Sequence, residues 1–95
     1  MKYEDLVLIS DPYKVYSKFK KIYSCDSDIK IRTRKNKKYM VYDPNIKKWF
    51  HFGSTMEDYT FHRDLQRRLK FKTRNRRWAD ADIYSSAYAS YTLLW

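Results

Sequence analysis

The sequence is poor in residues that interrupt secondary structure or cross-link a chain, with one glycine, two prolines and one cysteine among 95 residues. Little of the chain is suited to a flexible linker, so residues 1–95 are expected to form a single compact domain with one modest core. The lone Cys25 excludes an intramolecular disulfide and a zinc site built from several cysteines. An unpaired thiol also weakly favours a reducing compartment.

Long apolar runs are missing as well. The longest stretch without a charged residue, residues 83–95, is shorter than a transmembrane helix requires. The first ten residues contain Glu4 and Asp5 beside a short apolar run, so no signal peptide is expected. We therefore expect no membrane-spanning segment.

Acidic residues are scarce relative to basic ones. The chain has 11 Asp and Glu against 21 Lys and Arg, which gives a formal charge of +10 and a pI near 9.7. This balance predicts a polyanionic partner, namely nucleic acid, an anionic membrane surface or an acidic protein. Aromatic residues make up 19% of the chain, too many for a disordered basic tail, so the chain is expected to fold.

The pattern of apolar residues predicts an α+β fold. An N-terminal helix is expected to begin with Asp11 as N-cap and Pro12 at its first position. Residues 6–9 before it are either a strand or a segment that packs on this helix. Three strands, expected to form an antiparallel meander, follow at residues 28–33, 39–42 and 48–52.

A strongly basic segment, residues 61–78, follows the strands and is predicted to form one α-helix. Ser54 and Glu57 match a capping box, which places the helix start between residues 56 and 61. An apolar row at intervals of four, Phe61, Leu65 and Leu69, is expected to face the core. Five cations at intervals of four and three are expected to share another face, here called the basic row: Arg63, Arg67, Lys70, Arg74 and Arg77.

The basic row is the strongest functional feature. A solvated helix face is the alternative, but such faces usually mix both signs, and the basic row contains no acid. Its like charges repel, so a partner that neutralises them would stabilise the helix. A second basic patch is predicted near the first two strands, and from it we expect polyanion contacts by Arg32, Arg34, Lys37 and Lys38.

Aromatic side chains are interleaved with these cations. Packing is the expected role of most of them, and Trp78 and Tyr39 are weaker candidates for stacking on bases. The uncharged residues 83–95 are predicted to form an aromatic helix capped by Asp80 or Asp82. This helix either completes the core or docks on another protein. In the docking interpretation the contacts come from Tyr84, Tyr88, Tyr91, Leu94 and Trp95.

One cluster contains the residue types of catalytic and metal sites: His51, Glu57, Asp58, His62 and Asp64. These side chains could bind a metal or move a proton. The favoured interpretation is structural, because the carboxylates can cap a helix or pair with nearby arginines. The sequence has no Ser/His/Asp order, glycine-rich phosphate loop or HExxH motif, so we expect no catalytic residue, metal or cofactor.

Several ordered motifs from residue 38 onward carry a family resemblance. They are His51-Phe52-Gly53, Asp58-Tyr59-Thr60 followed by His62 and Asp64, the Arg67-Arg68 pair, and Leu93-Leu94-Trp95. Together they resemble a family of small proteins of nucleocytoplasmic large DNA viruses. The resemblance implies a location in the virion, or in the host cytoplasm or nucleus during infection, and it implies no established biochemical activity.

Two functional hypotheses from different classes follow. In the first, which the resemblance favours, the chain is a non-enzymatic minor virion or capsid component. Its aromatic C-terminal segment docks on other virion proteins, and its basic row meets an acidic surface. In the second, the same cations bind DNA non-specifically through the phosphates. A His/Asp metal-dependent enzyme is the least favoured, third hypothesis.

Overall fold

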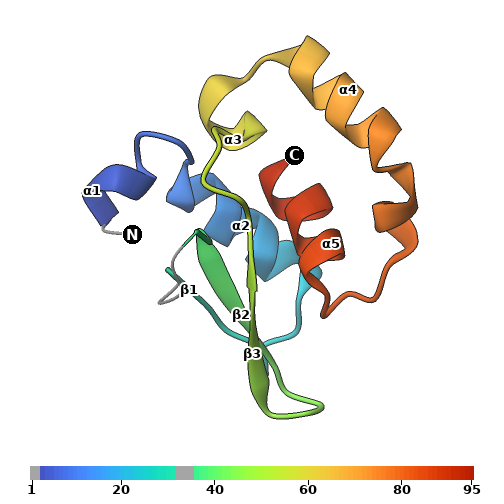
Figure 1. The fold of residues 1–95 in the computed structure, drawn as a ribbon. Coiled ribbons are helices and arrows are strands. Elements are labelled where there is room, and N and C mark those ends of the chain that lie inside the picture. Colours follow the sequence, from blue (N-terminus) through green and yellow to red (C-terminus); the bar gives the residue numbers. More distant parts are fainter. Residues whose placement is uncertain (1–2, 32–35) are drawn as a thin grey trace.

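The computed structural model describes residues 3–31 and 36–95. It confirms the α+β class, with an N-terminal helix, a three-stranded antiparallel sheet, and then helices that include a C-terminal one (Figure 1). The elements in chain order are α1 (Tyr3–Leu6), α2 (Pro12–Ile22), β1 (Ile29–Ile31), β2 (Tyr39–Asp43), β3 (Lys48–Phe52), α3 (Tyr59–His62), α4 (Leu65–Arg74), the 3-10 helix η1 (Arg76–Asp80), α5 (Ser86–Ala89) and the π-helical segment η2 (Ser90–Leu94).

Helix α2 begins where the sequence predicts. The Asp11 side chain accepts a hydrogen bond from the Lys14 N–H at 3.4 Å, and Pro12 occupies the first helical position. Before it, α1 ends at Leu6 and the chain turns, so a strand at residues 6–9 is wrong. Leu6 is fully buried and joins the same core cluster as Val15 of α2.

The three strands form the predicted meander. They pair in the order β1-β2-β3, with both pairs antiparallel. Val41 in the central strand lies opposite Ile29 on one side and Phe50 on the other. Alternate residues of β2 are buried, which turns Tyr39 and Val41 toward the core. The predicted end of the first strand, at Thr33, lies outside the described residues.

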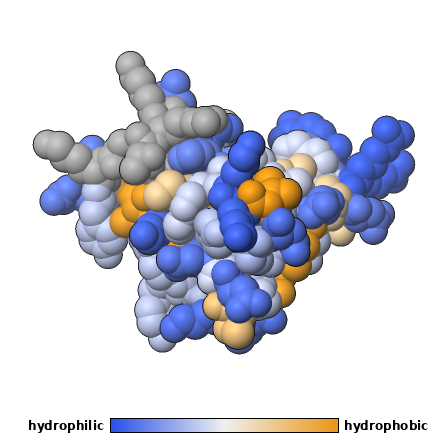
Figure 2. Space-filling view, turned by 90° about the horizontal axis from the view of Figure 1, so that it is seen from below, coloured by the Kyte–Doolittle hydropathy of each residue, from blue (hydrophilic) through white to orange (hydrophobic). Residues whose placement is uncertain are grey.

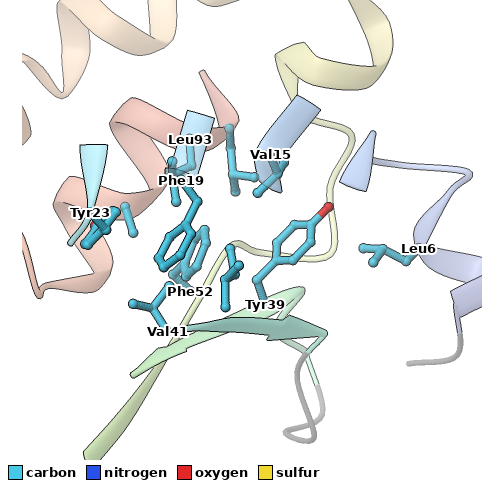
Figure 3. Close-up of a cluster of buried hydrophobic side chains, with 11 residues drawn as sticks. Leu6, Val15, Phe19, Tyr23, Tyr39, Val41, Phe52 and Leu93 are labelled. Atoms are coloured by element: carbon cyan, nitrogen blue, oxygen red, sulfur yellow. The ribbon is translucent and has the colours of Figure 1, made fainter. Parts of the chain in front are cut away.

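The core lies between one face of the sheet and the helices that pack on it. Figure 3 shows Val15 and Phe19 of α2 and Leu93 of η2 facing Val41 and Phe52 of the sheet. All five side chains are buried. The C-terminal segment therefore forms part of the domain's own core.

The predicted single helix at residues 61–78 is wrong, because the chain forms three shorter elements there. Arg63 adopts a left-handed conformation with φ of 55°, which ends α3. Asp64 then caps α4, and its side chain accepts hydrogen bonds from the N–H groups of Gln66 and Arg67. Beyond Arg74 the backbone tightens into η1. Asp64 therefore starts a new helix, although the sequence pattern predicts an interior position for it.

The capping box is also wrong. Ser54 and Glu57 lie in the irregular segment between β3 and α3. The N-cap of α3 is Asp58, whose side chain accepts a hydrogen bond from the Thr60 N–H at 3.0 Å. The other oxygen of the same carboxylate accepts a hydrogen bond from the buried Lys38.

The apolar row that was expected to face the core is exposed. Phe61, Leu65 and Leu69 are 40%, 61% and 63% exposed. Helix α4 instead turns Phe71 toward the rest of the domain, where its ring stacks on that of Trp95 with centroids 4.4 Å apart. The break at Arg63 interrupts the predicted period, and stacking on a ring distant in sequence determines which face of α4 points inward.

The predicted aromatic helix at residues 83–95 is split into α5 and η2. Ser85 caps α5 by accepting a hydrogen bond from the Tyr88 N–H at 3.2 Å, so capping by Asp80 or Asp82 is wrong. None of the described helices has the length and hydropathy needed to cross a membrane. Figure 2 shows one face of the molecule, on which hydrophilic residues surround a few separate apolar patches.

Candidate polyanion-binding groove

A cavity of about 520 Å³ lies between α4, the loop after β3 and the C-terminal elements α5 and η2. We call this cavity the α4 groove. In Figure 1, α4 and the C-terminal helices lie opposite each other. Its volume is within the range of pockets that take small organic ligands. The contacts of α4 with the C-terminal segment include the Phe71–Trp95 stack and the contacts of Arg68 with Trp95 and Lys72 with Tyr91.

Three aromatic rings line the groove. Phe71 and Trp95 stack with an interplanar angle of 8°, which joins α4 to the end of η2. Trp78 meets Phe71 edge to face, with centroids 5.8 Å apart and an angle of 78°. The Trp78 main-chain N–H donates to the Asn75 carbonyl at 2.9 Å, which fixes the backbone that carries the indole in η1. The groove therefore has an aromatic floor built from two segments of the chain.

Three cations of the basic row, Arg67, Lys70 and Arg74, line one wall of the groove. Their spacing of three and four places them side by side on α4, next to Phe71. Among the described residues that line the groove, Glu57 is the single acid. It contacts Arg67 at 3.8 Å with both side chains more than 40% exposed, so this ion pair contributes little. The wall keeps a positive charge that the described residues barely compensate.

Lys38, one of the predicted polyanion-binding residues, lines the groove but is buried and paired with a carboxylate. Its Nζ donates to Asp58 Oδ2 at 3.0 Å, and the two side chains are 2% and 0% exposed. Burial lowers the pKa of Lys38, while Asp58 acts in the opposite direction. The second carboxylate oxygen accepts hydrogen bonds from the Thr60 N–H and hydroxyl. The pair thus connects the chain before β2 to the start of α3 beneath the groove.

Two further cations hold α4 from its other side. Arg68 Nε donates to the Trp95 main-chain oxygen at 2.8 Å, and its guanidinium lies 5.0 Å from the Tyr59 ring centroid. Lys72 Nζ lies 4.5 Å from the Tyr91 ring centroid. Burial, followed by repulsion from Arg68, lowers the pKa of Lys72. The cations of α4 are thus divided between a groove wall and a set that fastens the helix.

The other predicted polyanion-binding residues are dispersed. Arg63 is the exposed hinge between α3 and α4, and Arg77 is exposed on η1 outside the groove. Lys37 lines the groove. Arg32 and Arg34 lie outside the described residues. Of the basic row, Arg67, Lys70 and Arg74 therefore line the α4 groove together. Arg63 and Arg77 lie outside it, because the predicted helix is interrupted before Leu65 and after Arg74.

The predicted protein-contact residues pack within the domain to different degrees. Leu94 is 1% exposed and belongs to the core cluster, so its side chain is covered by the domain itself. Tyr84 lies against the Tyr23 ring at 5.6 Å, and Tyr91 lies beneath Lys72. Trp95 stacks on Phe71 and lines the groove. Tyr88 is half-buried beside the core.

The histidine and carboxylate cluster does not assemble into one site. Asp58 binds Lys38, and Asp64 caps α4. His62 Nδ1 accepts a hydrogen bond from the Asp64 N–H at 2.9 Å, and its ring lies between those of Tyr59 and Trp95. Burial, followed by the charge of Arg67, lowers the pKa of His62. Within the described parts of the chain, no three His, Cys, Asp or Glu residues are arranged to hold a metal ion.

Sequence reasoning missed two residues that shape the groove. The apolar row predicts that the face with Leu65 and Leu69 points inward, and Phe71 lies on the opposite face of α4. The signal that could have found it was its position four residues after Arg67 and three before Arg74, which puts all three on one face. Gly53, the single glycine, lines the groove with φ of 83°.

A comparison with protein families gives a match that includes the three cations on the groove wall. Residues 27–75, from before β1 to the end of α4, match a family of unknown function, DUF5754. The chain belongs to this family. The match includes Arg67, Lys70 and Arg74 and stops before η1, so Trp78 and Trp95 lie beyond it. It assigns the chain to no virus. Comparisons with curated proteins and with solved structures give no match.

Proposed function

We propose that the chain is a non-enzymatic binding protein that holds a nucleic-acid strand in the α4 groove through the strand's phosphates. The observation that carries the proposal is the position of Arg67, Lys70 and Arg74 on one wall of a cavity with an aromatic floor. Lysine and arginine neutralise phosphates, and aromatic rings contact bases. The two kinds of side chain together match the two chemical parts of a nucleotide.

The shape of the site favours a nucleic-acid strand over an acidic protein. Carboxylates on a folded protein extend from a broad surface, so most of them would reach only the rim of a cavity between α4 and the C-terminal elements. A strand is narrow, and its phosphates follow one another at short intervals along a charged groove. The weak contact between Arg67 and Glu57 leaves the wall accessible to such a ligand.

A triple substitution of Arg67, Lys70 and Arg74 by glutamine is expected to weaken oligonucleotide binding by about 100-fold at 0.1 M salt, because the variant can neutralise fewer phosphates and releases fewer counterions on binding. Fluorescence anisotropy of a labelled single strand measures the affinity. A matched control replaces Lys20, Lys21 and Lys48, which are exposed away from the groove, and changes the net charge equally. Equal reductions in affinity for the two variants would contradict the proposal.

The exposed apolar row supports a second candidate function, in which the chain is a minor structural component of a large DNA virus. Leu65 and Leu69 lie outward on α4, next to its cations, with Phe61 on α3. Such a surface suits an acidic and partly apolar protein. The motif resemblance would make that protein another virion component.

A Leu65→Ser, Leu69→Ser variant tests this second candidate. We expect the variant to be absent from purified particles while it keeps its oligonucleotide affinity and its thermal stability, because both side chains are exposed in the isolated domain. Quantification of the protein in particles measures the effect. Incorporation at the wild-type level would rule out docking through this row.

A further inference from the structure

We infer that the α4 groove selects single-stranded over double-stranded nucleic acid by stacking one unpaired base on the indole of Trp78. The inference rests on the proposed function. It adds the strand state of the ligand and the residue that recognises it. Four features of the groove support it: the indole face free of ring stacking, its hydrogen-bonded backbone, its neighbouring cations and the size of the cavity.

Trp78 is the groove ring that keeps a face for a ligand. Phe71 and Trp95 stack on each other, which covers one face of each ring. Trp78 meets Phe71 nearly at right angles, and among the described residues no other ring contacts it. Its side chain is only partly buried and lines the groove. A planar base can therefore stack on this indole without displacing an existing ring contact.

The backbone that carries the indole is held in place before any ligand binds. Trp78 belongs to η1, which is separated from the end of α4 by Asn75 alone. Its main-chain N–H donates to the Asn75 carbonyl, and the Asn75 side-chain amide in turn donates to the Phe71 carbonyl at 3.1 Å. The fixed backbone and the edge-to-face contact with Phe71 reduce the ordering that binding requires, which favours a stacking role.

Two cations of α4, Lys70 and Arg74, line the same groove as this indole. Lys70, Arg74 and Trp78 are spaced four residues apart, and all three line the cavity. A strand whose phosphates contact Lys70 and Arg74 would bring the next base to Trp78. Phosphate contacts and base stacking would then act on adjacent nucleotides, as in other single-strand sites.

A duplex cannot offer such a base without opening. Its bases are stacked and paired inside the helix, and extruding one costs unstacking and unpairing energy. The cavity of about 520 Å³ has room for a group of the size of a small ligand, and a duplex is far larger. A duplex would meet only the cations at the rim, so its binding would lack the contribution of stacking.

The test uses the full chain and one oligonucleotide sequence, presented as a single strand of DNA, as the equivalent RNA and as the DNA duplex, at one salt concentration. Both single strands are expected to bind more tightly than the duplex. Trp78→Leu is expected to weaken single-strand binding roughly 5- to 150-fold and to leave duplex binding and the salt dependence unchanged. Trp49→Leu, on β3 away from the groove, is the matched control and should change neither.

A second measurement needs no substitution. A strand that carries 5-iodouracil is photo-crosslinked to the wild-type chain, and mass spectrometry is expected to locate the crosslink at Trp78. Equal affinity for single strand and duplex, unchanged binding by Trp78→Leu, or a crosslink elsewhere would overturn the inference. Salt-dependent binding would in those cases leave the proposed function standing. Absence of binding to every form would overturn both.

Discussion

Replacing Asp58 with alanine is expected to lower the free energy of unfolding by about 3–5 kcal/mol. The substitution leaves the ammonium of Lys38 buried without its partner, in a position where both side chains are at most 2% exposed. It also removes the cap of α3, because the same carboxylate accepts the Thr60 N–H. Urea denaturation at neutral pH, followed by circular dichroism, measures the change.

Two further variants separate the buried charge from the cap. Asp58→Asn keeps an oxygen that can accept from Thr60 while it removes the negative charge. The double variant Lys38→Met, Asp58→Asn removes both charges and is expected to lie closer to the wild type than Asp58→Ala does. A destabilisation below about 1 kcal/mol for Asp58→Ala would show that Lys38 escapes into the adjoining groove, against this view of the pair.

Gly53→Ala is expected to lower the free energy of unfolding by about 2–5 kcal/mol, through left-handed backbone strain and overpacking together. The φ of Gly53 is 83°, a conformation that side chains with a Cβ rarely adopt. An added Cβ would lie 2.9 Å from Leu94 Cδ1 and 3.3 Å from Lys38 Cβ. Both neighbours are buried, so neither can move away easily.

Lys47 provides a control of opposite sign for this substitution. Lys47 also has a positive φ, of 55°, but it lies exposed in the turn between β2 and β3. Lys47→Gly is expected to be neutral or to stabilise the domain by up to about 1 kcal/mol, since it relieves the strain without a steric consequence. A Gly53→Ala domain as stable as the wild type in urea would show that the backbone at this position can readjust.

Local signals account for the parts of the fold that the sequence predicts. Asp11 and Pro12 determine where α2 begins through the first turn of the helix alone, so the helix start can be predicted without knowledge of the rest of the chain. The alternation in β2 likewise reports which side chains are buried. Residues that depend on distant partners were not predictable in this way. The inward face of α4 depends on Trp95, and the buried ion pair of Asp58 depends on Lys38, whereas its capping role is a local signal.

The candidate site shows the same division. α4 carries the middle of the basic row, and Arg67, Lys70 and Arg74 line the same cavity. The predicted row also included Arg63 and Arg77, because its period assumed an unbroken helix. Arg63 instead adopts a left-handed conformation, which the sequence did not indicate. The groove itself could not be predicted, since it arises between α4 and a C-terminal segment that returns to pack on the sheet.

The salt dependence of single-strand binding tests most directly whether the α4 groove holds phosphates. For the wild type, the logarithm of the association constant is expected to fall linearly with the logarithm of the salt concentration. Replacing Arg67, Lys70 and Arg74 with glutamine is expected to reduce the magnitude of this slope by about 2, because each single-strand phosphate contact contributes about 0.7. The Lys20, Lys21 and Lys48 control should keep the wild-type slope. Identical slopes for the wild type and the groove variant would contradict the claim that phosphates bind in this groove.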